Sequence, residues 1–240
     1  MLHQLILILL APVFLAQGTY VRKSIPCLKE ADGPRKGKTE PRAPFAKKPL
    51  RILLLGDSAA AGVGAEHQSH ALSGQLVNAL KQHFYLEWQL IAKTGFTTQQ
   101  VLQSVTAHPK QAFDIVVLSV GVNDVTKPTS ANQWIKRQQT LTDTLRHHFD
   151  CQQIIFTKIP PMEKFPALPY PLRWYLGSKA KAFNRKLSTW ASTQHDCELL
   201  DLNQALSIEH MATDGFHPGP EIYRFWGASV AQVIKSRWMP

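Results

Sequence analysis

The sequence predicts an α/β fold of three layers, in which helices cover both faces of a parallel sheet. Two observations lead to this prediction. Short apolar runs such as Leu50–Leu55 and Phe113–Val120 have the length and the composition of strands that are buried on both faces. Longer stretches with helical periodicity separate these runs, and strands that alternate with helices are typical of parallel sheets.

The predicted elements run from residue 50 to the end of the chain, which we interpret as one domain. A chain of 240 residues is long enough for one such core and too short to assume two. We expect strands over residues 50–55, 85–92, 113–120, 153–157 and 198–202, and helices over residues 66–83, 98–107, 131–149, 178–193 and 221–237. Ligands of open parallel sheets bind beyond the carboxyl ends of the strands, so the loops there are the place to look for a site.

The first 21 residues, 1–21, form a hydrophobic segment without Lys, Arg, Asp or Glu. They fit an export signal, with small residues for cleavage around Ala16-Gln17-Gly18, and they also fit an uncleaved membrane anchor. The basic residues that follow favour the anchor, because positive charge tends to stay on the cytoplasmic side. We therefore expect a membrane-associated protein of the cell envelope, and the sequence leaves the side of the membrane open.

Residues 22–49 are rich in Pro, Lys and Arg and show no hydrophobic period, which predicts an extended basic linker. Nine Lys and Arg stand against three acids between Gly18 and Leu50, so most of the net charge of +10 lies there. Contact with anionic lipid headgroups and a merely solvated linker both fit this composition. From Arg51 onward 18 basic residues face 14 acidic ones. The domain is thus close to neutral, and we expect no nucleic-acid partner.

Polar residues follow two of the predicted strands. The first strand ends in Gly56-Asp57-Ser58, and a serine at such a glycine-bordered turn can expose its hydroxyl at the edge of the sheet. A phosphate loop is excluded, because GxGxxG starting at Gly62 would need a glycine at His67. The third strand leads to Asn123, whose amide can stabilise a developing oxyanion. We expect Asp57 and Asp124 to make local hydrogen bonds only.

The loop Asp214-Gly215-Phe216-His217-Pro218 sets a carboxylate three residues before an imidazole, just ahead of the last helix. A serine nucleophile needs a histidine to take its proton, and a carboxylate beside that histidine fixes its tautomer and stabilises the imidazolium. Alone, each of these segments reads equally well as a turn, a cap or a surface histidine. Their joint occurrence in loops at one edge of the sheet favours nucleophilic catalysis by Ser58.

Four segments together resemble the sequence blocks of the SGNH (GDSL-like) hydrolase family: GDS at 56–58, the glycine of TGFTT at 95, GVND at 121–124 and DGFHP at 214–218. The resemblance covers residues 50–234. It implies a flavodoxin-like five-stranded parallel sheet with the strand order 2-1-3-4-5. Ala59 and Ala92 stand where many members have Leu and Asn, which leaves the subfamily open.

The resemblance also implies the role of each site residue. Ser58 would be the nucleophile, His217 the general base and acid, and Asp214 the acid that orients it. The oxyanion hole would consist of the N–H groups of Ser58 and Gly95 and the side chain of Asn123. The implied reaction is hydrolysis of a carboxylic ester through an acyl-enzyme. We predict no cofactor, and no metal, because the histidines lack metal-ligand spacing with carboxylates.

The long apolar loop 160–176 leaves the same edge of the sheet, and it supplies Phe165, Tyr170 and Trp174 as candidate substrate-binding residues. With the hydrophobic N-terminus, it favours a lipid-like or short acyl ester such as a lysophospholipid. An O-acetylated glycan, acyl transfer to an alcohol, and a binding module on the same fold are the alternatives. Nothing in the sequence indicates the oligomeric state.

Cys151 and Cys197 each precede a predicted strand, the fourth and the fifth. The resemblance makes these two strands parallel neighbours, so the two cysteines fit a disulfide. Two buried free thiols are the other alternative, and the one we favour.

Overall fold

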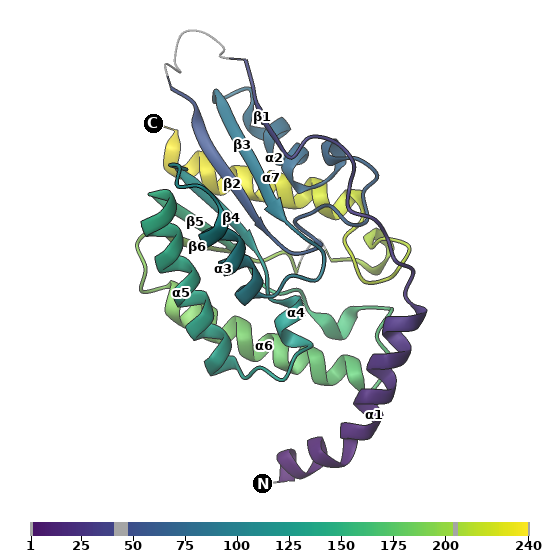
Figure 1. The fold of residues 1–240 in the computed structure, drawn as a ribbon. Coiled ribbons are helices and arrows are strands. Elements are labelled where there is room, and N and C mark those ends of the chain that lie inside the picture. Colours follow the sequence, from purple (N-terminus) through teal and green to yellow (C-terminus); the bar gives the residue numbers. More distant parts are fainter. Residues whose placement is uncertain (1, 41–47, 204–205, 240) are drawn as a thin grey trace.

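A six-stranded sheet forms the middle layer of the molecule, with the strand order β1-β3-β2-β4-β5-β6 (Figure 1). The computed structural model describes residues 2–40, 48–203 and 206–239. The strands are β1 (Lys36–Lys38), β2 (Leu50–Gly56), β3 (Leu86–Ala92), β4 (Ile115–Ser119), β5 (Gln153–Thr157) and β6 (Cys197–Leu200). Strands β2 to β6 are parallel and take the expected order.

Helices cover both faces of this sheet, which confirms the three-layer α/β fold. In Figure 1, α2 and α7 lie together on one face, and α3, α5 and α6 lie on the other. Their bounds are α1 (Leu2–Ser24), α2 (Leu72–Leu80), α3 (Thr98–Ala107), α4 (Val122–Val125), α5 (Ala131–Phe149), α6 (Leu172–Ala191) and α7 (Pro220–Trp238), with 3-10 turns at Gln68–His70, Met162–Lys164 and Ile208–His210.

Strand β2 lies in the centre of the sheet and divides its side chains between two apolar cores. Ile52 and Leu54 join the core under α2 and α7, while Leu53 and Leu55 join the core under α3, α5 and α6. This division follows from the two-residue repeat of a strand. It explains why the strand reads as a continuous apolar run, since neither of its faces meets water.

The sixth strand, β1, corrects the prediction of a five-stranded sheet and of an unstructured linker over residues 22–49. It pairs antiparallel with β3, and Lys38 forms an ion pair with Glu87 at 3.2 Å. Gly37 lies against the Trp88 ring, since a Cβ at this position would be only 3.0 Å from Nε1 of Trp88. The strand spans three residues and two of them are exposed, so it leaves no hydrophobic period in the sequence. Residues 41–47 of the expected linker lie outside the described residues.

Helix α1 lies against α6 at its C-terminal half, while its N-terminal half extends past the body of the molecule (Figure 1). The Phe14 ring stacks on the Tyr175 ring at a centroid distance of 4.7 Å. The Gln17 amide donates to the Tyr170 carbonyl at 2.8 Å and accepts from the Leu172 N–H at 3.1 Å. No helix in the described part of the chain combines the length and the apolarity that crossing a membrane requires, so the expected spanning anchor is not supported there.

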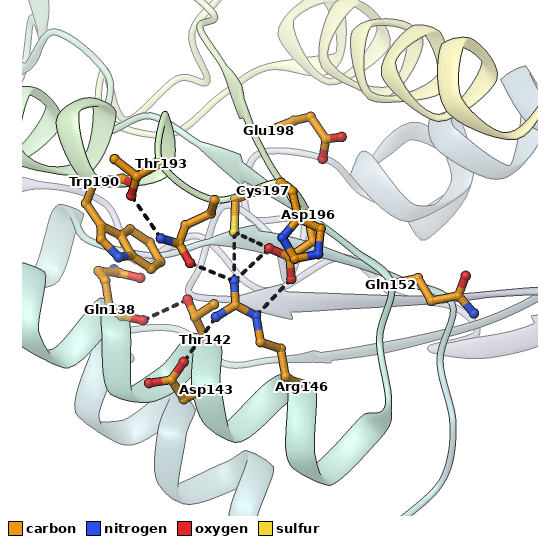
Figure 2. Close-up of polar contacts among 12 residues, drawn as sticks. Gln138, Thr142, Asp143, Arg146, Gln152, Trp190, Thr193, Asp196, Cys197 and Glu198 are labelled. Atoms are coloured by element: carbon orange, nitrogen blue, oxygen red, sulfur yellow. Dashed lines mark hydrogen bonds and ion pairs between the residues drawn. The ribbon is translucent and has the colours of Figure 1, made fainter.

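Polar contacts around a single arginine, Arg146, link α5 to the start of β6 (Figure 2). They lie at the end of the sheet away from the carboxyl ends of the strands. The Arg146 guanidinium donates to both carboxylate oxygens of Asp196, at 2.6 and 2.8 Å, and to Gln194 at 3.0 Å. The exposed Asp143 forms a further ion pair with Arg146 at 3.1 Å. The Cys197 sulfur lies 3.7 Å from the same guanidinium.

The cysteines carry free thiols, so the structure takes the second of the two alternatives for Cys151 and Cys197. Burial is the main cause that raises the pKa of each of these thiols to about 12. Cys27 is exposed.

Candidate active site

A serine and a histidine that lie far apart in the sequence meet at the carboxyl end of the central strand. Ser58 follows β2 directly, and its hydroxyl lies 2.9 Å from Nε2 of His217, which belongs to the loop before α7. Ser58 is 9% exposed, and the His217 side chain is 15% exposed. The distance is that of a hydrogen bond, through which a proton can pass from the hydroxyl to the imidazole.

Asp214 holds the other nitrogen of this imidazole. Its Oδ2 lies 2.5 Å from Nδ1 of His217, and its Oδ1 accepts the backbone N–H groups of Phe216 and His217 at 2.9 and 3.0 Å. Burial works to raise the pKa of Asp214, but these hydrogen bonds outweigh it and leave the pKa below its ordinary value. The carboxylate therefore stays charged, and it fixes the tautomer that presents Nε2 to Ser58 as an acceptor.

A glycine allows the loop of the histidine to approach the loop of the serine. Gly64 has φ of +97°, and a Cβ there would lie 2.2 Å from the carbonyl oxygen of Pro218. No other residue fits both this conformation and this contact. Gly64 therefore sets the spacing between the two segments that carry Ser58 and His217.

The other two residues predicted for the oxyanion hole, Gly95 and Asn123, lie in the loop after β3 and in α4. In this loop the N–H groups of Lys93, Thr94 and Phe96 all have acceptors, whereas the described hydrogen bonds give the Gly95 N–H none. Asn123 donates one of its two amide N–H bonds to the Phe96 carbonyl at 3.0 Å, which fixes the orientation of its amide. Both residues thus keep donor capacity, although neither lines the cavity that opens at Ser58.

A narrow cavity of about 70 Å³ opens beside Ser58 and His217. Most of its wall is apolar, and the wall includes Ile159, Phe165, Met211, Phe216, Ile222 and Trp226. Phe165 and Phe216 meet edge to face at 5.1 Å, and Phe216 meets the His217 ring at 5.2 Å. The cavity wall and the imidazole therefore pack against each other directly.

Of the three predicted substrate-binding residues, only Phe165 lies in this cavity. Tyr170 is 71% exposed, and its carbonyl accepts the hydrogen bond of Gln17. Trp174 lies on α6 and lines a separate groove beside the start of α5. The structure places Tyr170 and Trp174 outside this cavity, and α6, which begins at Leu172, carries Trp174 away from the loop.

Sequence reasoning missed the burial of Asp57, the residue that precedes Ser58. Asp57 is 2% exposed and borders the cavity, and its Oδ1 accepts the Ala59 N–H at 3.2 Å. The sequence predicted a local hydrogen bond for Asp57, but it did not predict that the pKa of this carboxyl would be raised. Burial raises the pKa of Asp57 to about 7, although the Ala59 N–H and the nearby His217 oppose the shift. Its place after a strand buried on both faces was the only available signal.

Asp124 is also buried and links α4 to the start of α3. It accepts the N–H and the hydroxyl of Thr98 at 2.8 and 2.9 Å, and burial raises its pKa despite these bonds. Among the described residues, no group of His, Cys, Asp and Glu has the make-up of a metal site.

Comparisons with known proteins agree with this arrangement. A model of the GDSL-like Lipase/Acylhydrolase family matches residues 54–225. Comparison with curated proteins gives no match. Among solved structures, a lipolytic protein of the G-D-S-L family from Veillonella parvula is similar, with a TM-score of 0.62, 15% identity, and coverage of 78% of this chain and 98% of that one.

Two further solved structures have the same fold. One is Est24, a carbohydrate acetylesterase from Sinorhizobium meliloti, with a TM-score of 0.60, 15% identity, and coverage of 80% of this chain and 100% of that one. The other is an aryl esterase from M. smegmatis, with a TM-score of 0.61, 17% identity, and coverage of 78% and 98%. At such identities the similarity carries the fold alone.

Proposed function

Because the chain belongs to the GDSL-like lipase/acylhydrolase family and is an ester hydrolase, we propose that Ser58, His217 and Asp214 cleave carboxylic esters of short acyl groups. One observation carries this proposal. An unbroken chain of hydrogen bonds runs from the Ser58 hydroxyl through His217 to the charged Asp214, at 2.9 and 2.5 Å. This is the arrangement that nucleophilic attack by a serine requires.

The reaction follows from these contacts in two halves. Ser58 Oγ attacks the ester carbonyl carbon while its proton passes to Nε2 of His217, and Asp214 stabilises the imidazolium that forms. The N–H groups of Ser58 and Gly95 and the Asn123 amide donate to the oxyanion. His217 then protonates the departing alkoxide. Water attacks the acyl-enzyme by the same route, and Ser58 regains its proton as the acid is released.

The size of the cavity supports a short acyl group. Its volume of about 70 Å³ is less than the roughly 150 Å³ of an apolar cavity that takes up benzene, so it suits an acyl group of only a few carbons. A long lipid chain does not fit this space, and two of the residues expected to line a lipid pocket lie elsewhere. Two similar structures are described as a carbohydrate acetylesterase and an aryl esterase. We therefore favour small esters, such as O-acetyl groups on glycans, over the lysophospholipids that the sequence favoured.

Alanine at Ser58 or at His217 tests the assignment of the nucleophile and the base. We expect each variant to fold and to lose at least about 1,000-fold in kcat on p-nitrophenyl acetate, because the members of such a set act as a unit. Asp214→Asn should lose less than either variant, since the imidazole remains in place. Circular dichroism checks the fold. Full activity in folded Ser58→Ala would refute the assignment.

The same assay with acyl chains of graded length tests the substrate class. We expect kcat/KM to peak between acetate and butyrate and to fall for octanoate and longer esters. A peak at long chains would instead support the lipid-like substrate. An added alcohol acceptor that captures most of the acyl group would identify a transferase. Wild-type protein without turnover on any of these esters would favour a binding module.

A further inference from the structure

A carboxylate outside the family-matched part of the chain reaches the loop that carries Gly95. Glu30 lies in the segment between α1 and β1, whereas the family match begins at residue 54. Its Oε1 accepts the backbone N–H of Thr94 at 2.6 Å and the Thr94 hydroxyl at 2.8 Å. Thr94 directly precedes Gly95. The N-terminal segment is thus hydrogen-bonded to Thr94, the residue before the expected oxyanion donor Gly95.

We propose that Glu30 is a positioning residue for the oxyanion hole, which clamps Thr94 so that the Gly95 N–H points toward the developing negative charge. The inference rests on the proposed function, because it concerns the same reaction. It assigns a catalytic contribution to a segment that the sequence presents as a basic linker.

The loop needs such a clamp because Gly95 is not held by packing. Its φ is +83°, and no neighbouring atom lies within 4 Å of the place where a Cβ would be. Glycine populates many conformations with similar ease, so the direction of the Gly95 N–H depends on the hydrogen bonds of its neighbours, among them the one from the Phe96 N–H to the Lys93 carbonyl at 3.1 Å. Phe96 is fixed on one side by the Asn123 amide, at 3.0 Å. Glu30 supplies the corresponding restraint on the other side.

Arg35 holds the clamp itself in place. Its guanidinium forms an ion pair with Glu30 at 2.9 Å and also donates to the carbonyl of Ala92, the last residue of β3. Burial works to raise the pKa of Glu30, but the Thr94 hydrogen bonds and Arg35 hold the pKa below its ordinary value. Glu30 therefore accepts as a charged group, and such hydrogen bonds are stronger than neutral ones.

Substitution of Glu30 in the full chain tests the inference. Loss of a whole oxyanion donor lowers kcat by about 100- to 1,000-fold, so loss of its clamp should have a smaller effect. We expect Glu30→Ala to lower kcat on p-nitrophenyl acetate about tenfold with KM within twofold. Glu30→Gln keeps an oxygen that can accept from Thr94, and we expect it to retain at least a third of the wild-type kcat.

A tetrahedral inhibitor distinguishes positioning from a loss of stability. A short alkyl boronic acid forms a tetrahedral adduct with a nucleophilic serine and places an oxygen in the oxyanion hole. Glu30→Ala should weaken its binding about as much as it lowers kcat. Glu87→Ala is the matched control, because Glu87 also pairs with a basic residue beside β3, at 3.2 Å from Lys38. We expect this control to leave kcat and inhibitor binding unchanged.

The outcomes separate the two proposals. Wild-type kcat and inhibitor binding in folded Glu30→Ala, while Ser58→Ala is inactive, would overturn the role of Glu30 alone. Equal losses in Glu30→Ala and Glu87→Ala would overturn it as well, because both would then act through stability. Activity in Ser58→Ala would overturn the proposed function itself.

Discussion

Two carboxylates of the site have opposite pKa shifts: Asp57, which precedes Ser58 in the sequence, and Asp214, which is hydrogen-bonded to His217. Asp214 has three hydrogen-bond donors for its charged form, and its pKa is lowered in spite of burial. Asp57 is buried to a similar extent, but the described hydrogen bonds give it one donor, and its pKa rises to about 7. The three donors to Asp214 outweigh the effect of its burial on the pKa, whereas the single donor to Asp57 does not.

The raised pKa of Asp57 predicts a specific dependence of stability on pH. Its folded-state pKa of about 7 lies above the ordinary value of 3.8, so the stabilising contribution is present below about pH 4 and is lost as pH rises through 7. The full loss is on the order of 4 kcal/mol. Asp57→Asn cannot ionise, so we expect its free energy of unfolding to fall less between pH 5 and pH 8 than that of the wild type.

Urea unfolding at the two pH values measures this difference. Asp143→Asn serves as the control, because the Asp143 side chain is 64% exposed. Carboxylates with lowered pKa values, such as Asp214, lose their contribution only as pH falls through their own folded pKa, which lies below this window. Equal pH dependence in Asp57→Asn and wild type would contradict the argument.

The residues of the candidate site were largely predictable from type and order. Ser58, Asp214 and His217 were expected together, and the structure brings them within hydrogen-bond distance. Glu30 was not predictable, because a single acid in a basic segment has no period or spacing that marks its target. Its contact with Thr94 joins residues that are 64 positions apart in the sequence.

Among the elements, α6 begins earlier than the expected pattern predicts. The many prolines of residues 160–171 predicted a loop as far as residue 176, yet the helix begins at Leu172, directly after the last of them. Leu172, Leu176 and Ala180 are buried and follow the helical repeat. The apolar content of the stretch was read as a pocket lining, although part of it is the buried face of a helix.

The link between α5 and β6 gives a prediction at the same scale. Asp196 receives two charge-assisted hydrogen bonds from Arg146, and its side chain is 7% exposed. We expect Asp196→Asn to lower the free energy of unfolding by about 2 kcal/mol, because it removes the buried counter-charge of a half-buried guanidinium and leaves only the exposed Asp143. Asp143→Asn removes the exposed partner of the same arginine and should cost less than about 0.5 kcal/mol.

Urea unfolding at pH 7 compares the free energies of unfolding of these two variants and the wild type. Figure 2 shows both carboxylates beside Arg146. Esterase activity should stay unchanged in both variants, because the contacts of Arg146 lie at the opposite end of the strands from Ser58. Equal destabilisation by the two substitutions would show that burial of Asp196 has no effect on the strength of the pair.

At the scale of the whole molecule, non-covalent contacts hold the layers together, since no disulfide links the cysteines in the described chain. We expect three thiols to react with a thiol reagent in unreduced, denatured protein. In native protein the exposed Cys27 should react first, because the other two thiols are buried and have pKa values of about 12. Fewer than three reactive thiols after denaturation would contradict the free-thiol state.

The sequence predicted the layers of the molecule better than its N-terminal part. Buried strands and amphipathic helices leave a clear periodicity, and the five parallel strands follow it. The segment of β1 and the docked half of α1 have mixed polarity, and their positions depend on contacts such as Gln17 with Leu172. Where the enzyme acts in the cell stays a prediction from residues 1–21.

The short strand β1 also affects how readily a second copy of the protein can pair with this edge of the sheet. An uncovered outer strand of a sheet invites pairing with another chain, which leads to aggregation. Here the outermost position is taken by three residues, of which Lys36 and Lys38 are exposed. A second chain that paired with β1 would have to displace water from two ammonium groups, and it would gain very few backbone hydrogen bonds. The segment that braces the oxyanion loop thus also discourages the sheet from propagating between molecules.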